Sequence, residues 1–216
     1  MRIPIVTAVA VGVAAVAAVV QYAVPAAVPT LQRDPGGLPA GEWWRLLTPL
    51  FVQTLGWYQV VTNLVTLALV GAVAERQLGR WRWAVLFAAG TVAGQVAAYA
   101  WHEPGGGYSI AVCGLAGGVV AWSAADPSAA SRWTMSVVGC YVAALAGWGV
   151  GGIWVAVGLV AVAAIVLPFV PVAGVFGAAA ALATVLAFDS DLHGVSLLAG
   201  MVTALALAAL RKRQVQ

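Results

Sequence analysis

Long apolar segments recur along the whole chain, and they constrain its fold more than any other feature. Each approaches the roughly 20 residues that an α-helix needs to cross the hydrocarbon core of a bilayer. Hydrophobic residues make up 63% of the chain and charged residues only 8%, and the mean hydropathy is +0.98. Soluble domains do not have this composition. The sequence therefore predicts an all-α membrane protein, a polytopic helical bundle in one transmembrane domain over residues 1–216.

The gaps between the apolar segments predict eight membrane spans. We expect them near residues 4–28, 56–75, 82–101, 109–125, 133–149, 152–169, 172–188 and 191–210. Proline and glycine mark the divisions because they interrupt helical hydrogen bonding. The weakest divisions are at GWGVGG (147–152) and LPFVP (167–171), where the chain could instead form longer or broken helices. Six spans are therefore the alternative count.

Basic residues predict the orientation of the bundle. Arg76, Arg80 and Arg82 lie in one gap, and the cluster at 211–213 follows the last span. Short basic segments stay in the cytoplasm, so both termini are expected there. The segment HEPGGGY (102–108) then lies at the outer face, as does DSDLHG (189–194). With the net charge of +3 confined to such gaps, no nucleic-acid partner is expected.

Composition also indicates the source of the chain. Alanine, valine, glycine and arginine are abundant while lysine occurs once, which is typical of a GC-rich bacterial genome. The predicted location is therefore the bacterial plasma membrane.

Two reactive side chains are predicted to lie at similar depth below the outer face. Cys113 follows the start of one span by a few residues, and His193 follows the start of another. At 1.5 Å per residue, both lie about 3 to 6 Å below their helix starts. An imidazole beside a thiol can generate the thiolate that attacks carbonyl groups. The residues alone leave open a cysteine used only for packing and a histidine solvated beside neighbouring aspartates.

Small residues near both side chains favour close helix packing. Gly114 and Gly118 are four residues apart, as are Ser196 and Gly200, so each pair occupies one helical face. Such faces let two membrane helices approach closely. They would allow the thiol and the imidazole to meet.

Four segments, in this order, resemble the rhomboid family of intramembrane proteases. GEWWRLLTPLFVQ (41–53) is similar to the first outer loop, with Trp44 and Arg45. NLVTLALVGAVAERQLG (63–79) is similar to the second helix, with Gly71, Glu75 and Gly79 at four-residue intervals. AVCGLAGG (111–118) stands where rhomboids carry a Gly-x-Ser-Gly nucleophile segment, and HGVSLLAG (193–200) resembles the last helix with its catalytic histidine. The resemblance covers residues 41–210 and implies a core of six spans with two extra spans.

The resemblance also implies site residues. Rhomboids use a serine and a histidine, without a third acidic residue, to cleave transmembrane segments near their outer ends. By position, Cys113 becomes the nucleophile and His193 the base. Gln59 and Asn63 become oxyanion donors together with the backbone at Gly114. Cysteine thus replaces the motif's serine, and Gln59 replaces a histidine.

Two functions follow as expectations. The first is a peptidase with a Cys113–His193 dyad, and the alternative is an inactive rhomboid-like protein that binds or regulates transmembrane partners. Transmembrane proteins, as substrates or clients, and the bilayer are the expected partners. Two distant cysteines and two histidines do not form a zinc motif, and there is no nucleotide fingerprint, so no metal or cofactor is expected.

Overall fold

A computed structural model describes residues 3–215, apart from the side chains of residues 129, 214 and 215. The helices are α1 (Ile5–Ala23), α2 (Ala27–Leu31), α3 (Trp57–Leu78), α4 (Arg80–Ala100), α5 (Ser109–Ala125), α6 (Arg132–Val166), α7 (Val172–Phe188) and α8 (Leu192–Val215). Short 3-10 helices span Trp43–Leu46, Thr48–Phe51, Pro127–Ala129 and Leu167–Phe169. The described part of the chain contains no β-strand, and the predicted all-α class is confirmed.

Eight apolar helical segments correspond to the eight predicted spans. Five helices of the described chain are long and apolar enough to cross a membrane, and α5 and α7 are shorter apolar helices of 17 residues each. The eighth segment arises because α6 is broken at Gly151 and Gly152. Gly152 has φ +73°, a conformation that glycine adopts without steric cost. Both weak divisions of the sequence are therefore breaks in the helical path.

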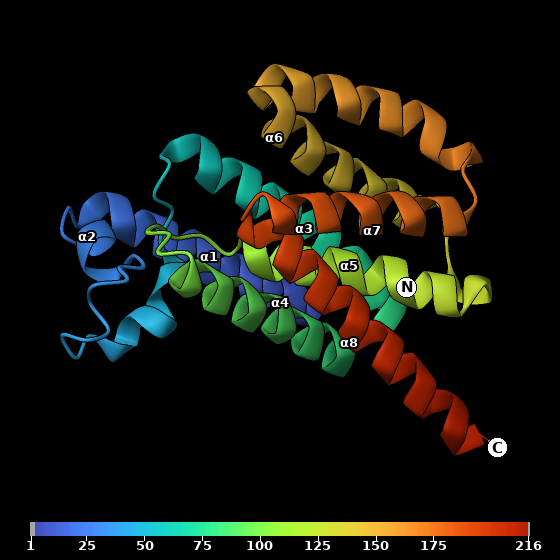
Figure 1. Cartoon of the computed structure of the whole chain (residues 1–216), viewed down its shortest axis with the longest axis horizontal. Helices are drawn as coiled ribbons and strands as arrows, with labels where there is room; N and C mark the ends of the chain where they lie inside the picture. Colours follow the sequence, from blue (N-terminus) through green and yellow to red (C-terminus); the bar gives the residue numbers. More distant parts are fainter. Residues whose placement is uncertain (1–2, 216) are drawn as a thin grey trace.

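Helix α5 lies at the centre of the bundle. Its residues from Ile110 to Ser123 are all buried, and its largest contact is with α8. Helices α3, α4 and α7 also pack against α5, while α6 turns back on itself at the edge of the molecule (Figure 1). Its glycines at positions 114, 117 and 118 let the neighbouring helices approach closely, which is how helices pack within a membrane.

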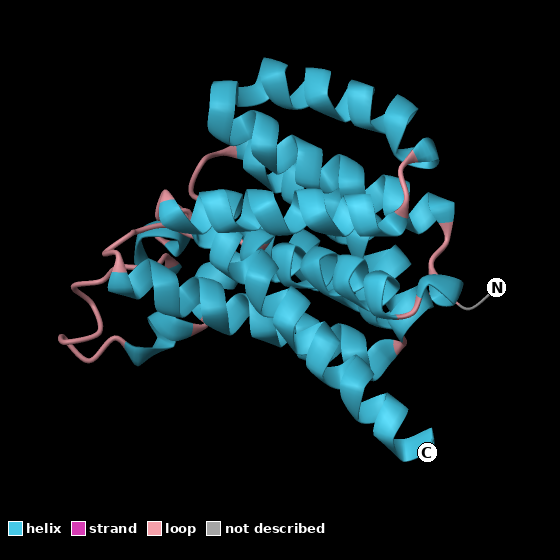
Figure 2. Cartoon of the chain, turned by 45° about the vertical axis from the view of Figure 1, so that its right-hand side comes forward, coloured by secondary structure: helices cyan, strands magenta, loops and turns pink. Residues whose placement is uncertain are grey.

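The longest connection, between α1 and α3, lies at the end of the bundle where α5 begins (Figures 1 and 2). An isolated antiparallel bridge joins Arg33 of this connection to Gly105, four residues before α5. The Arg33 side chain is buried, and its Nη1 donates a 2.6 Å hydrogen bond to Oε1 of Gln95. The bridge fixes the segment that leads into α5.

Candidate active site

Ser109 is the first residue of α5, and it contacts α8. Its Oγ lies 2.9 Å from Nε2 of His193, the second residue of α8. Both side chains are only partly buried. Because Ser109 begins the helix, the first backbone N–H groups of α5 have no carbonyl partner within it. A hydroxyl, an imidazole and free amide donors therefore meet at one point.

Asp191 precedes α8 and holds the imidazole from the other side. Its Oδ1 accepts a 2.8 Å hydrogen bond from the backbone N–H of His193, as an N-cap residue does. The same oxygen lies 2.7 Å from His193 Nδ1. Burial raises the pKa of the Asp191 carboxyl, but the hydrogen bonds and charge of His193 outweigh it, so the pKa lies below its ordinary value. Ser109, His193 and Asp191 thus have the contacts of a serine protease triad.

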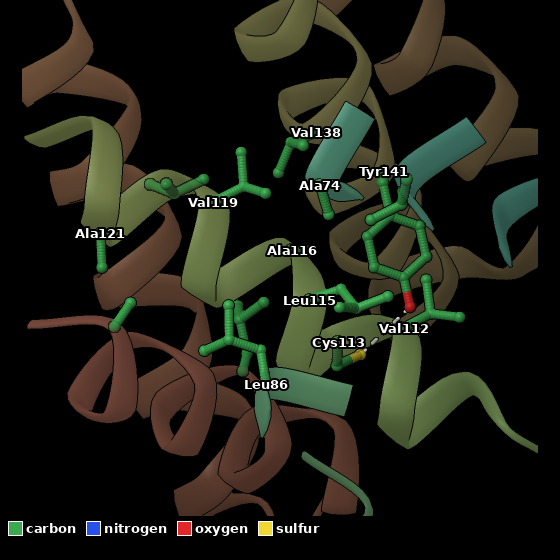
Figure 3. Packing of buried hydrophobic residues seen from close by; sticks show 14 of the residues in the cluster. Ala74, Leu86, Val112, Cys113, Leu115, Ala116, Val119, Ala121, Val138 and Tyr141 are labelled. Atoms are coloured by element: carbon green, nitrogen blue, oxygen red, sulfur yellow. Dashed lines mark hydrogen bonds between the residues drawn. The ribbon is translucent and has the colours of Figure 1, made fainter. Parts of the chain in front are cut away.

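Cys113 lies one helical turn deeper than Ser109 and is fully buried. Its Sγ lies 3.1 Å from Oη of Tyr141 on α6, within an apolar cluster (Figure 3). Tyr141 Oη also donates a 3.4 Å hydrogen bond to the carbonyl of Ser109. Among the described residues there is no hydrogen bond between Cys113 and His193. The structure thus brings His193 to Ser109 and leaves Cys113 in the core.

The position of Gly114 bears on its predicted role as an oxyanion donor. It is the sixth residue of α5, where the backbone N–H bonds within the helix, and only the first four N–H groups of a helix are free. Gly114 is fully surrounded, with the backbone of Gly90 on one side and that of Gly200 on the other. In the part of the chain that the structure describes, the backbone N–H groups of Ser109 and Ile110 donate no hydrogen bond, whereas those of Ala111 and Val112 donate to the carbonyl of Tyr108.

A sequence signal for Ser109 does exist. Gly107, Tyr108 and Ser109 preserve the Gly-x-Ser part of the rhomboid motif, and Ile110 replaces its final glycine. The segment at Cys113 preserves only the final glycine of that motif. Sequence reasoning missed Ser109, and it considered the aspartates beside His193 only as part of a solvated loop.

Three side-chain amides gather around Gly107. A Cβ at this position would lie 2.9 Å from Nε2 of Gln59, 3.1 Å from Oε1 of Gln53 and 3.4 Å from Nδ2 of Asn63. Asn63 Nδ2 donates a 2.6 Å hydrogen bond to Gln53 Oε1, and Gln59 Nε2 donates to the carbonyl of Gly106 at 3.1 Å. Gly107 also has φ +134°. Gln59 and Asn63 therefore lie around Gly107, a position that only glycine fits and that precedes Ser109 by two residues.

Helix α1 supports this amide cluster through Gln21. The Gln21 side chain accepts a 2.7 Å hydrogen bond from the backbone N–H of Gln53 and donates a 3.0 Å bond to its carbonyl. Both residues are buried. Continuous hydrogen bonds thus connect α1 to Asn63 through Gln53.

Glycines bring α5 and α8 together about one to two helical turns beyond Ser109 and His193. Gly200 packs on the backbone of Gly114, and Gly117 packs on that of Leu197. Gly118 instead faces the side chain of Leu86 on α4. The predicted close approach of the two helices is present, with Gly117 added and Gly118 directed to α4.

The first outer loop is organised by Arg45. The buried guanidinium pairs with Glu42 and donates to the carbonyls of Pro29 and Gln32 at 3.1 and 2.7 Å. Trp44 is exposed, and its Nε1 donates to the carbonyl of Thr30 at 3.2 Å. Both side chains hold the loop and lie outside the contacts of Ser109 and His193.

Gly71, Glu75 and Gly79 organise the other end of α3. Gly71 allows the Thr7 side chain of α1 to approach, and Gly79, with φ +83°, joins α3 to α4. Glu75 accepts hydrogen bonds from the backbone N–H groups of Val6 and Thr7 at 3.1 and 2.7 Å. These three residues therefore have structural contacts, far from Ser109.

No group of three His, Cys, Asp or Glu side chains in residues 3–215 could hold a metal ion. The side chains that meet at Ser109 and His193 are a hydroxyl, an imidazole and a carboxylate, with side-chain amides around Gly107. These are groups of acid–base and nucleophilic chemistry.

Comparison with known proteins identifies the family to which the chain is similar. The Rhomboid domain model matches residues 40–213. The chain is 33% identical over 81 residues to "Rhomboid protease GluP" of Bacillus subtilis (strain 168), a match that covers 37% of this chain and 16% of that protein. It is 32% identical over 63 residues to "Putative rhomboid protease YdcA" of the same strain, covering 29% and 31%. The chain thus matches less than a third of the length of either relative.

The family model covers most of the chain, and the apolar helices agree with a membrane-embedded domain. The chain therefore belongs to the rhomboid family and is an integral membrane protein.

Proposed function

We propose that this rhomboid is an intramembrane serine peptidase in which Ser109 is the nucleophile, His193 the general base and Asp191 the residue that orients the histidine. The observation that carries the proposal is the 2.9 Å contact between Ser109 Oγ and His193 Nε2. Hydrogen-bond reach between nucleophile and base is the geometric requirement of this chemistry.

The reaction follows the acyl-transfer pattern. Ser109 Oγ attacks the carbonyl carbon of the scissile peptide while its proton passes to His193 Nε2. The resulting imidazolium keeps its Nδ1–H bonded to Asp191, 2.7 Å away. The imidazolium then donates its proton to the leaving amine. Water, activated by the same nitrogen, hydrolyses the acyl-enzyme and restores the hydroxyl.

The oxyanion of the tetrahedral intermediate would be held by two kinds of donor. The free N–H groups at the start of α5 point out of the helix end, where the helix dipole favours negative charge. Gln59 and Asn63 gather at Gly107 beside them. Each such preorganised donor is typically worth a factor of about 100 to 1000 in rate.

The proposed substrates are transmembrane segments, cleaved near their outer ends. Ser109 and His193 lie at the ends of their helices and are partly exposed, at the end of the bundle that carries the long connection between α1 and α3. The basic residues predict that this end faces outward. The site is therefore placed to meet a peptide bond near the outer membrane surface.

Two alternatives remain as proposals of lower rank. In the first, Cys113 is the nucleophile, which requires α5 to expose a side chain that is fully buried. In the second, the protein is an inactive rhomboid-like binder of transmembrane segments. The replacements of a motif glycine by Ile110 and of a motif histidine by Gln59 favour this second alternative.

Cleavage of a transmembrane reporter in liposomes tests all three. We expect wild-type cleavage, loss in Ser109→Ala and His193→Ala by about 10³-fold or more, and retention in Cys113→Ala. A fluorophosphonate probe should label the wild type and fail to label Ser109→Ala. Cleavage that survives Ser109→Ala and disappears in Cys113→Ala would establish the cysteine dyad. Absence of both cleavage and labelling in a folded wild type would establish the binder.

A further inference from the structure

A basic cavity opens at the opposite end of the bundle from Ser109. It lies where α1 begins and α3 passes into α4, and its volume is about 900 Å³. Arg76, Arg80 and Arg82 line it together with Glu75, and the first residues of α1, Ile3 and Ile5, form another part of the wall. The wall thus combines guanidinium groups with apolar side chains.

The single carboxylate of the cavity is already engaged. Glu75 accepts from the backbone of Val6 and Thr7, and also from Thr7 Oγ1 at 2.9 Å. Its nearest guanidinium is that of Arg80, with Nε 3.6 Å from Oε1. One negative charge therefore faces three positive ones, and the cavity carries a net charge of +2.

Two of the three guanidinium groups are available to a ligand. Arg82 donates to the carbonyl of Leu78 at 3.0 Å and stacks on Trp122, 4.7 Å from the ring centre. Arg76 makes no hydrogen bond or ion pair with the described residues, and Arg80 has only the contact with Glu75. Both side chains are exposed. The cavity is therefore poised to receive an anion between Arg76 and Arg80.

An apolar stripe leads from the same cavity along α1. Ile5, Val9, Val13 and Val16 follow one another at helical spacing and are 48%, 60%, 49% and 64% exposed. Ile5 lines the cavity itself, so the stripe begins where the basic wall ends. The order of groups, first cationic and then apolar, matches an anionic head attached to a hydrocarbon chain.

We propose that this cavity binds one anionic phospholipid, with its phosphodiester between Arg76 and Arg80 and an acyl chain along the α1 stripe. A soluble phosphate would use the arginines but make no contact with the stripe. A zwitterionic lipid would match the stripe but carry no net charge to complement the +2 of the wall. Basic pockets on the cytoplasmic side of membrane helices are suited to such head groups, and the predicted orientation places the cavity on that side.

Binding would tie α1 to the junction of α3 and α4, next to the hydrogen bonds of Glu75. The cavity makes no contact with Ser109, His193 or Asp191, so the lipid site is independent of the proposed peptidase chemistry. A ligand that binds only the folded state raises its stability by mass action. Lipid binding should therefore appear in the unfolding temperature and not in cleavage.

The test uses the purified full chain in detergent, titrated with dioctanoyl phosphatidylglycerol and followed by thermal unfolding and native mass spectrometry. The matched controls are dioctanoyl phosphatidylcholine, with the same chains, and glycerol 3-phosphate, with the phosphate alone. We expect a saturable rise in the unfolding temperature and one bound lipid for phosphatidylglycerol only. The double variant Arg76→Gln/Arg80→Gln should bind about 30-fold more weakly, the factor expected for two arginines at an anionic surface.

A second pair of variants separates a site from general charge. Arg132→Gln/Arg213→Gln removes the same charge from exposed positions outside the cavity, and it should retain the affinity of the wild type. The single variant Arg76→Gln, which removes an unpaired exposed side chain, should bind about 5-fold more weakly if the double variant does not fold. Equal binding of phosphatidylcholine, an equal loss in the control pair, or a full shift with glycerol 3-phosphate would each overturn the proposal.

Discussion

Asp191 Oδ1 lies 2.7 Å from Nδ1 of His193 and also accepts the backbone N–H of the same residue at 2.8 Å. An ionised carboxylate only accepts hydrogen bonds, so Nδ1 must carry the proton of a neutral imidazole. Nε2 is then free to accept from the hydroxyl of Ser109, 2.9 Å away. One aspartate oxygen therefore sets both the orientation and the tautomer of the histidine.

Replacing Asp191 by asparagine should lower kcat and leave KM nearly unchanged. The loss in the serine protease template is about 10⁴-fold, and because Asp191 is 37% exposed, solvent screening should reduce the loss here to about 10²-fold. Asparagine preserves the helix cap, so folding should be retained. The measurement is reporter cleavage over a range of substrate concentrations, with Asp189→Asn as the neighbouring control. Equal losses in the two variants would contradict the assigned role.

The stability contributed by the Asp191–His193 pair should depend on pH in the acid range. The pKa of Asp191 is lowered in the folded state, so the folded protein binds fewer protons than the unfolded chain as pH falls. The contribution is complete above the ordinary aspartate pKa of about 3.9 and is lost as pH falls through the lower, folded value. The difference in unfolding temperature between wild type and Asp191→Asn should therefore shrink as the pH falls below about 4. A difference that grows on acidification would refute this linkage.

The variant Gln21→Leu should impair catalysis from a distance. Leucine fills a similar volume but leaves the buried N–H and carbonyl of Gln53 unpaired, at a cost of about 1 to 3 kcal/mol each. Gln53 then no longer holds Asn63 through its 2.6 Å hydrogen bond. We expect a lower unfolding temperature and a kcat reduced about tenfold, by the loss of part of one oxyanion donor.

Gln77→Leu is the matched control for Gln21→Leu. It removes another largely buried amide, whose Nε2 donates to Ser123 Oγ at 2.7 Å at the far end of the bundle. Its unfolding temperature should fall while kcat is retained. If the two variants lose kcat equally, the effect is a general loss of stability and Gln21 has no special connection to the site.

Gly200→Ala should destabilise the contact between α5 and α8. The added methyl group would meet the backbone of Gly114, which cannot rotate away, and overpacking of this kind costs about 1 to 3 kcal/mol. Gly177→Ala on α7 is the control, because nothing lies within 4 Å of its Cβ position. That variant should be neutral or up to about 1 kcal/mol more stable, as alanine favours the helix. The measurement is the thermal unfolding of both variants. Equal stability of Gly200→Ala and Gly177→Ala would show that α8 moves to accommodate the methyl group.

Hydropathy predicted the helical segments well because each membrane span must be apolar over most of its own length. That property can be read from the residues of the span alone. Even the uncertain division at residues 147–152 proved to be a break, since Gly152 adopts a positive φ. Local patterns say nothing, however, about contacts between distant segments. The buried Arg33 side chain is hydrogen-bonded to Gln95, which is 62 residues away in the sequence. The residues around Arg33 do not predict this partner.

The site was harder to predict for a geometric reason. Ser109 and Cys113 are four residues apart and so share one helical face, and they differ mainly in depth, by about 6 Å. A helix boundary read from sequence is uncertain by several residues, which is as much as this difference. His193 and Asn63 depend on matches to longer segments, and His193 contacts Ser109 while Asn63 lies at Gly107. The proposal of Ser109 as nucleophile depends on where α5 begins, which the sequence alone does not fix.

The number of helical segments between α5 and α8 determines at which end of the bundle His193 lies. From the end of α5 the chain passes through the two arms of α6 and through α7 before α8 begins, an odd number of segments. One segment gained or lost here would start the histidine helix at the other end of a 17-residue α5, about 25 Å from the serine. Insertions and deletions in this part of the chain are therefore expected only in pairs of helices, and the break in α6 supplies the third segment that keeps their number odd.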